Sequence, residues 1–383
     1  MNHHKHIGKT KKRENFYRTR YYEVMIDTKN QPFIPLYGLA DDIKTTLLNL
    51  IHNSGEIPSD IYKPLDIKAG TFRAKITQLR QDGLIRRNFE DKVHTYLLTP
   101  AGRKRFKIIP PYIRTAADLK TRLRHIRLAR LNACLEGLNV TTFLEMNPPL
   151  KNFANNQFAQ DSLHFYNSYF LKPTVAKNSL GFRRSKAMGV LAGRDNAFML
   201  YYSPEACDFY HEERLFSNFV CDYMNIRYDE MKMMIVVDTL YQASYWLHFL
   251  LSQSQYFDGD SPLDLFEKVQ LLVLDRNAGE SFELLYREVE LAAAVMDEMK
   301  IQDRNMSNLS YNTINNGKKE RFFFVFTLDI YHIRYIIATA EYETDKTVHI
   351  ITTRYLSLVI NALVKDTRIE IHFLNPGFVD AFI

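Results

Sequence analysis

The sequence predicts a mixed α+β and α/β fold, with a small N-terminal module followed by a larger domain built on a mixed sheet. Its 383 residues exceed one domain of common size. Apolar side chains between Lys68 and Asp82 recur with the period of a helix. After residue 180, short continuous apolar runs alternate with helical stretches. Such runs are typical of strands that helices cover on both faces.

Composition shifts and proline positions divide the chain into four segments. Pro32 and Pro35 precede the first helical pattern. Pro110 and Pro111 mark a break before the helix that follows the module. We expect a basic flexible arm (1–36), a small DNA-binding module (37–108), a connecting amphipathic helix (112–140) and an α/β domain of unknown role (141–383).

The N-terminal module has the element order of a winged helix-turn-helix. We expect helices over 41–53, 58–62 and 68–82, strands over 84–87 and 93–98, and a last helix over 99–106. In the third helix Phe72, Ile76 and Leu79 form one apolar stripe. Gly83 can take a positive φ and end that helix, and Thr99 with Pro100 opens the last one. The stripe leaves the opposite helix face free to enter a DNA groove.

Charge is distributed unevenly along the chain. Residues 1–130 hold 27 Lys and Arg against 12 Asp and Glu, a net +15, whereas the remainder holds 23 against 32, a net −9. A basic patch on one module is typical of phosphate binding. We therefore expect double-stranded DNA as the partner, with the acidic body facing away from it; a module used for protein contacts is the alternative.

The residue types on the free face of the third helix suit a DNA groove. Thr71, Arg73, Thr77 and Gln78 are candidates for base contacts. Six cations are candidates for phosphate contacts, which set affinity rather than sequence choice. They are Lys68 at the helix start, Arg86, Arg87 and Lys92 in the wing, and Arg103 and Lys104 in the last helix.

Beyond the module we expect one cationic helix and then alternating strands and helices. The helix spans 116–138 and carries Arg122, Arg124, Arg127 and Arg130. Strands are predicted over 187–192, 197–202, 232–237, 269–274, 321–326, 348–352 and 369–373. Helices are predicted after the third of these strands, ending at 251, and over 281–299 and 355–364. The segments 147–178 and 304–319 are predicted to be irregular.

Carboxylates follow several of these strands and leave two interpretations open. Asp238, Asp275 and Asp329, with Asp258 and Asp260 in a loop, could hold Mg²⁺ for phosphodiester cleavage. Helix N-capping is the favoured interpretation. The Glu-x-Lys pattern occurs at 230–232 and 298–300, outside the strand register that a restriction-type nuclease needs. The sequence therefore favours a protein without enzymatic activity, and we assign no catalytic, cofactor or metal residues.

Other notable residues have simpler interpretations. His3, His4 and His6 could bind metal but fit a basic arm, and the remaining histidines are scattered. The aromatics Tyr201, Tyr202, Phe209 and Tyr210 could stack on single strands, although packing under a sheet is favoured. The basic patch 183–186 could contact DNA or form salt bridges. Three separated cysteines fit buried thiols in a reducing cytoplasm, and no apolar run is long enough for a membrane span.

Three segments together resemble the replication-relaxation family of plasmids and integrative elements. They are T-F-R-A-K-I-T-Q-L-R-Q-D-G-L-I-R-R (71–87), Y-L-L-T-P-A-G-R-K-R-F (96–106) and L-R-H-I-R-L-A-R (123–130). The resemblance covers roughly residues 39–135 and implies a DNA-binding protein acting in plasmid replication, transfer or their control. It also implies a C-terminal domain related to restriction-endonuclease folds.

These observations predict a sequence-specific, cytoplasmic DNA-binding protein of a mobile genetic element. Its α/β body would form a homodimer or bind replication or transfer proteins. A metal-dependent nuclease that uses Asp238, Asp275 and Asp258 is the first alternative. A regulator whose body senses a small molecule is the second.

Overall fold

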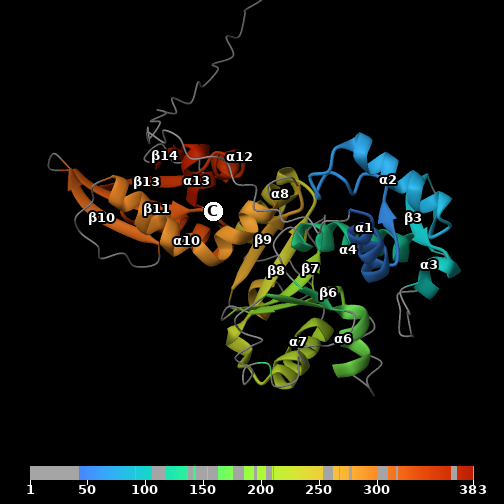
Figure 1. Cartoon of the computed structure of the whole chain (residues 1–383). Helices are drawn as coiled ribbons and strands as arrows, with labels where there is room; N and C mark the ends of the chain where they lie inside the picture. The colour runs from blue at the N-terminus through green and yellow to red at the C-terminus, as the bar shows by residue number, and fades with distance from the viewer. Residues whose placement is uncertain are drawn as a thin grey trace, which may run out of the picture.

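The computed structural model describes residues 43–90, 92–105, 118–136, 141–143, 153, 163–175, 185–193, 196–203, 209, 211–252, 262–266, 268–275, 278–299, 309–315, 318–363 and 369–382. These residues form helices and three sheets, so the predicted α+β and α/β class is confirmed at that level. The predicted arm over 1–36 lies outside them. A small N-terminal module lies beside a larger body (Figure 1).

The N-terminal module, residues 43–105, contains three helices and a three-stranded antiparallel sheet of order β1-β3-β2. Its elements are α1 (Ile43–Ser54), β1 (Ile57–Pro58), α2 (Ala69–Gln81), β2 (Ile85–Glu90), β3 (Val93–Leu98) and α3 (Pro100–Arg105). The stripe Phe72, Ile76 and Leu79 is buried as predicted and packs against the sheet and α1.

Local signals set the ends of two of these helices. Gly83 takes a φ of 68°, and its N–H donates to the Arg80 carbonyl at 3.0 Å while the Leu84 N–H donates to the Leu79 carbonyl at 3.0 Å. These two hydrogen bonds end α2, and they require a residue in the left-handed backbone conformation, which Gly83 supplies. The Thr99 hydroxyl accepts from the Gly102 N–H at 3.0 Å and caps α3. Both predictions from the sequence are confirmed.

The helix predicted over 58–62 is absent, and that prediction is wrong. Ile57–Pro58 forms the edge strand β1, with Ile57 opposite Tyr96, and turns follow through Asp66. Ile57, Ile61 and Leu65 are all buried. Their spacing of four resembles a helical stripe, but here it arises from turns that pack on the core.

The body contains a seven-stranded mixed sheet of order β12-β9-β8-β7-β6-β5-β4. Its strands are β4 (Thr141–Phe143), β5 (His164–Asn167), β6 (Ala187–Gly193), β7 (Asn196–Tyr202), β8 (Met231–Val237), β9 (Val269–Val273) and β12 (Leu328–Asp329). Its chain segments also include α4 (Leu119–Glu136), α6 (Ser168–Val175), α7 (His211–Met224), the 3-10 turn η3 (Tyr228–Glu230), α8 (Leu240–Ser252), α9 (Pro262–Leu265) and α10 (Ala278–Glu298). The central pairs β7–β8 and β8–β9 are parallel, and β6 and β7 form an antiparallel hairpin.

A second sheet of order β10-β11-β13-β14 follows, so the body has two sheets rather than the single one that the sequence suggested. Its elements are β10 (Ser310–Asn315), β11 (Lys318–Val325), α11 (Ile330–Tyr342), β13 (Lys346–Thr353), α12 (Ser357–Leu363), β14 (Ile369–Leu374) and α13 (Pro376–Phe382). Strands β11, β13 and β14 are parallel, and β10 is an antiparallel edge.

Helices cover both faces of the two sheets, which gives three layers (Figure 1). One continuous core joins α7, α8, α11 and α12 to one face of both sheets. On the other face α4 and the start of α10 cover the larger sheet, and the rest of α10 and α13 cover the smaller one. Within the described residues, no helix is both long enough and apolar enough for a bilayer span.

Two segments predicted as irregular contain strands, so these predictions are wrong. Within 304–319, β10 is polar because it is an edge strand, and its sequence S-Y-N-T-I-N looks like a loop. Within 147–178, β5 and α6 adjoin without an intervening turn. Four-residue strands such as β5 are too short to show a period, and their packing decides their structure.

The helix α4 joins the module to the body through a buried ion pair. Arg122 on α4 and Glu56 before β1 are both 0% exposed, with Nε and Oε2 3.4 Å apart. The same guanidinium donates to the Glu90 carbonyl at 3.0 Å and to the Thr95 hydroxyl at 3.3 Å. Arg122, one of the four arginines that make this helix cationic, is therefore inside the protein.

We predict that Arg122→Met lowers the free energy of unfolding by about 3–5 kcal/mol, because it leaves the Glu56 carboxylate buried without its partner. Urea unfolding of the full chain, followed by circular dichroism, measures this loss. Arg334→Met, at an exposed position of α11, is the control and should change stability by less than about 0.5 kcal/mol.

The double variant Glu56→Gln/Arg122→Met should regain part of the loss, because no unpaired charge remains in the interior. A double variant as unstable as the sum of both single variants would contradict the ion-pair explanation.

Candidate nucleic-acid interface

Helix α2 exposes a polar face opposite its buried stripe. The side chains of Thr71, Arg73, Thr77 and Gln78 are all exposed, as the sequence predicted. The Thr77 hydroxyl donates to the Arg73 carbonyl at 2.9 Å, so Thr77 presents mainly its methyl group to the outside. The remaining side chains offer a guanidinium, an amide and a hydroxyl on one helix face.

The N-terminus of α2 has no side-chain cap. Lys68 is the N-cap residue, with φ −57° and ψ 131°, and its side chain makes no capping bond. Lys68 and Gly70 are exposed, and an added Cβ at Gly70 would meet nothing within 4 Å. Backbone N–H groups at such an end favour an anion, and Lys68 adds a positive charge beside them.

The β2–β3 hairpin extends the surface of α2 on one side only. Side chains alternate along β2, so Arg87 and Phe89 share the face of Ile85, which packs in the core with Leu79 of α2. The Arg87 guanidinium hydrogen-bonds to the His94 ring. The centroids of the Phe89 and His94 rings are 4.0 Å apart. Phe89 is 57% exposed, so its ring belongs to the surface of the hairpin.

Two of the predicted wing cations lie on the other side of the hairpin. Arg86 shares its face with Asn88, which is opposite Thr95, and Thr95 contacts Arg122 of α4. Lys92, at φ 62° in the turn, lines a cavity between the hairpin and α4. Arg86 and Lys92 are exposed, but they do not lie beside α2 as Arg87 does.

The two predicted cations of α3 differ in exposure. Lys104 is exposed, whereas Arg103 is half-buried and interacts with other residues of the protein. Of the predicted set, the structure therefore groups six residues at α2 and its side of the hairpin: Lys68, Thr71, Arg73, Thr77, Gln78 and Arg87. Phe89 belongs to the same surface and was not predicted, because its role depends on the strand register.

This surface points away from the body. Helix α2 packs on the hairpin face that carries Tyr96, with the Phe72 and Tyr96 rings 6.3 Å apart. Helix α4 contacts the opposite face through Thr95. Figure 1 shows α4 between the module and the larger sheet, with α2 at the outside.

Comparisons with known proteins add no relative to this geometry. No protein-family description, curated protein or solved structure matches the chain. The function must therefore be argued from the residues themselves.

The other arginines of α4 also bind protein groups. Arg124 donates to the Ala187 carbonyl at 2.9 Å and to the Ser168 hydroxyl at 3.1 Å, both in the body. Arg127 lies 4.4 Å from the centroid of the Tyr202 ring. These contacts hold α4 on the larger sheet.

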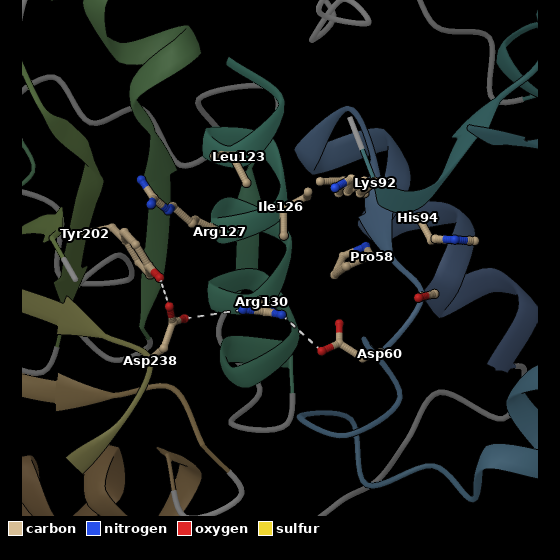
Figure 2. Close-up of a pocket in the computed structure, with 12 residues that line it drawn as sticks. Pro58, Asp60, Lys92, His94, Leu123, Ile126, Arg127, Arg130, Tyr202 and Asp238 are labelled. Atoms are coloured by element: carbon tan, nitrogen blue, oxygen red, sulfur yellow. Dashed lines mark hydrogen bonds and ion pairs between the residues drawn. The ribbon is translucent and has the colours of Figure 1, made fainter. Parts of the chain in front are cut away.

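Arg130 connects the module directly to the body. Figure 2 shows its guanidinium between Asp60, at 3.0 Å, and Asp238, at 3.4 Å. The Tyr202 hydroxyl donates to the other oxygen of Asp238. Burial opposes the charge on Arg130, but the two carboxylates raise the pKa of its guanidinium above the usual value.

A cavity of about 430 Å³ lies at this junction. Both parts of the protein line it, and it has charges of both signs (Figure 2). The lining residues are Pro58, Ser59, Asp60, Lys92, Val93, His94, Leu123, Ile126, Arg127, Arg130, Tyr202 and Asp238. Two of its carboxylates bind Arg130, so the charge of that guanidinium is neutralised inside the protein.

The strand-end carboxylates have different roles. Asp329 accepts from the N–H groups of Tyr331 and His332 and caps α11, as predicted. Asp238 does not cap α8, because Thr239 accepts from the Gln242 N–H at 3.2 Å and so takes that position. Asp275 accepts from the Tyr355 hydroxyl at 2.9 Å. Residues 258 and 260 lie outside the described residues.

Several other sequence features prove to be structural. Tyr201 and Phe209 are 0% exposed and pack edge to face at 5.0 Å, which confirms the packing interpretation for these two. Cys134 and Cys221 are buried free thiols, and burial raises the pKa of each to about 12. Tyr210, Cys207, Arg183 and Arg184 lie outside the described residues.

The Glu-x-Lys pattern at 230–232 is divided between two contacts. Glu230 pairs with Arg227 at 3.0 Å, and the Lys232 ammonium donates to Asn196. Burial lowers the pKa of Lys232. Neither partner is an acidic residue at the end of a neighbouring strand.

We predict that Arg130→Met loosens the contact between the module and the body by about 1 kcal/mol, because a half-exposed ion pair contributes little more than that. Amide hydrogen exchange of residues 59–61 and 238–240 should accelerate, while exchange in the β8–β9 core stays unchanged. Unchanged exchange at 59–61 would show that Arg130 does not hold the two parts together.

Proposed function

We propose that this chain binds double-stranded DNA, with α2 in the major groove and the β2–β3 hairpin as a wing. The supporting observation is the shared surface of α2 and Arg87, which is polar, cationic and directed away from the body. The element order helix, short strand, helix and hairpin suits a winged helix, in which the helix before the hairpin enters the groove.

The charges within the module support this orientation. Residues 43–105 hold twelve Lys and Arg against six Asp and Glu. Glu56, Asp60 and Glu90 lie within 4 Å of arginines of α4, on the side away from α2. Three of the six acidic residues are thus paired on the side of the body, and Asp82, which follows α2, pairs with Lys44.

Within this proposal the residues divide by chemistry. Thr71, Arg73, Thr77 and Gln78 read base edges, and Lys68 and Arg87 bind the adjacent phosphates. Arg86 and Lys92 lie off the side of the hairpin that faces α2, Arg103 is half-buried and Lys104 is on α3, and we assign all four weaker, flanking phosphate contacts.

The wider role rests on the resemblance to the replication-relaxation family. We propose a cytoplasmic protein of a mobile genetic element that acts in plasmid replication, transfer or transcriptional control. Its body, which we relate to restriction-endonuclease folds, would form a homodimer or bind replication or transfer proteins. Selection of bound genomic fragments followed by sequencing tests this role: plasmid origins indicate replication, and the chain's own promoter indicates regulation.

We predict that Arg73→Ala reduces discrimination at one base position by about 1–3 kcal/mol, whereas Arg87→Ala weakens binding of all sequences and lowers the salt slope by about 1. Fluorescence anisotropy with a selected site and its single-base variants, at several salt concentrations, separates the two effects.

Arg334→Ala is the matched control, because this exposed arginine lies on α11 of the body. It should leave both the affinity and the salt slope unchanged. Equal loss by Arg73→Ala on every sequence would contradict base reading. Failure of the wild-type protein to bind any duplex in low salt would refute DNA binding altogether.

A metal-dependent nuclease remains the second candidate, because Asp238 and Asp275 follow the adjacent parallel strands β8 and β9. In α/β sheets, ligands gather at this edge. Against it, Asp238 is bound to Arg130 and Tyr202, and Asp275 to Tyr355.

We predict that the purified protein leaves supercoiled plasmid intact in Mg²⁺ or Mn²⁺, as gel electrophoresis would show. Cleavage that is lost in Asp275→Asn and retained in Arg334→Ala would establish the nuclease instead.

A further inference from the structure

Two histidines and a glutamate meet on one face of the second sheet, far along the chain from the DNA-binding surface. His349 on β13 lies opposite Glu370 on β14, and His372 follows two residues later on the same face. The His349 Nδ1 atom lies 2.9 Å from His372 Nε2 and 3.6 Å from Glu370 Oε2. One ligand atom from each residue falls within 4.8 Å of the others.

These separations match those between ligands of one metal ion. Zinc binds imidazole nitrogen and carboxylate oxygen at about 2.0–2.2 Å in tetrahedral geometry, which places neighbouring ligand atoms about 3.3 Å apart. The two distances from His349 Nδ1 lie on either side of that value. Two imidazoles and a carboxylate are also a donor set that suits first-row transition metals rather than Mg²⁺ or Ca²⁺.

The other nitrogen of His349 is a second indication. The His349 side chain is 9% exposed, and its Nε2 has no hydrogen-bond partner. A hydrogen bond between the two rings satisfies Nδ1 but leaves Nε2 unpaired inside the protein, which is costly. The nearest carboxylate, Glu320 on β11, has its Oε2 3.9 Å away.

A metal ion on His349 Nδ1 would explain why His349 Nε2 faces the Glu320 carboxylate. Metal-bound histidines commonly direct their second nitrogen at a carboxylate, which fixes the ring and strengthens the ligand. Glu320 is placed for that role after a small movement. Phe322 stacks on the His349 ring at 4.4 Å and 14°, which restricts its rotation.

We propose that His349, Glu370 and His372 bind one divalent transition-metal ion of the zinc class, with Glu320 positioning His349. Three protein ligands leave a fourth coordination position, and the Glu370 side chain, 37% exposed, opens that position to solvent. The site is independent of the proposed DNA binding, and it lies where the sequence showed only scattered histidines.

The test uses the full chain with His3, His4 and His6 replaced by Gln, so that the histidine-rich start cannot bind the probe. Titration calorimetry with ZnCl₂ at pH 7.5 should give one ion per chain, and CoCl₂ should give the intense visible absorption of a tetrahedral site. His372→Gln in this background should weaken Zn²⁺ binding at least 100-fold. Glu320→Gln should weaken Zn²⁺ binding about 10–100-fold, as the loss of a residue that hydrogen-bonds to a metal ligand typically does.

His248→Gln, at an exposed position of α8, is the matched control and should bind as the background does. Glu370→Gln serves where a histidine variant unfolds, and circular dichroism checks each fold. Lowering the pH to 5 should weaken binding, because protons compete for the imidazoles. Absence of Zn²⁺ binding in the background protein would overturn the proposal. So would His372→Gln and Glu370→Gln variants that each bind Zn²⁺ as tightly as the background protein does.

Discussion

The buried pair of Arg122 and Glu56 determines how the two parts of this protein are held together. Two opposite charges with 0% exposure are a costly arrangement, and they persist only where further hydrogen bonds surround them. Arg122 obtains these bonds from the Glu90 carbonyl and Thr95 in the hairpin. Its guanidinium can make them in one orientation of α4 against the hairpin only. The pair thus contributes to the specificity of the arrangement more than to its stability.

That fixed orientation has a consequence for recognition. Helix α4 contacts the Thr95 face of the hairpin and α2 the Tyr96 face, so α4 and α2 lie on opposite sides. Arg124 then holds α4 to the body through Ala187 and Ser168. The proposed recognition helix is therefore presented outward by a rigid connection, and the acidic body lies behind it. A duplex bound at α2 would experience the cations first and the body only at a distance, where salt screens charge.

Features that depend on neighbouring residues could be predicted from the sequence, and those that depend on distant partners could not. Gly83 and Thr99 act within one helical turn, so their roles in ending α2 and capping α3 were readable. The edge strand β10 needs its partner β11 to be recognised. The same holds in the site: the exposure of Arg73 follows from helical period, but the separation of Arg86 from Arg87 follows from strand register. His349 and His372 are likewise brought together by β13–β14 pairing, which no local pattern encodes.

Net charge alone overstates the size of the proposed nucleic-acid surface of this chain. The first 130 residues carry +15, and four of those cations are the arginines of α4. Arg122 and Arg130 neutralise Glu56 and Asp60, and Arg124 and Arg127 bind a carbonyl and a ring of the body. The positive charge of Arg122 and Arg130 thus neutralises carboxylates that would otherwise repel a phosphate near the module. Under the proposed DNA binding, Arg122 and Arg130 would assist without touching DNA, because they pair Glu56 and Asp60 on the inner side of the module.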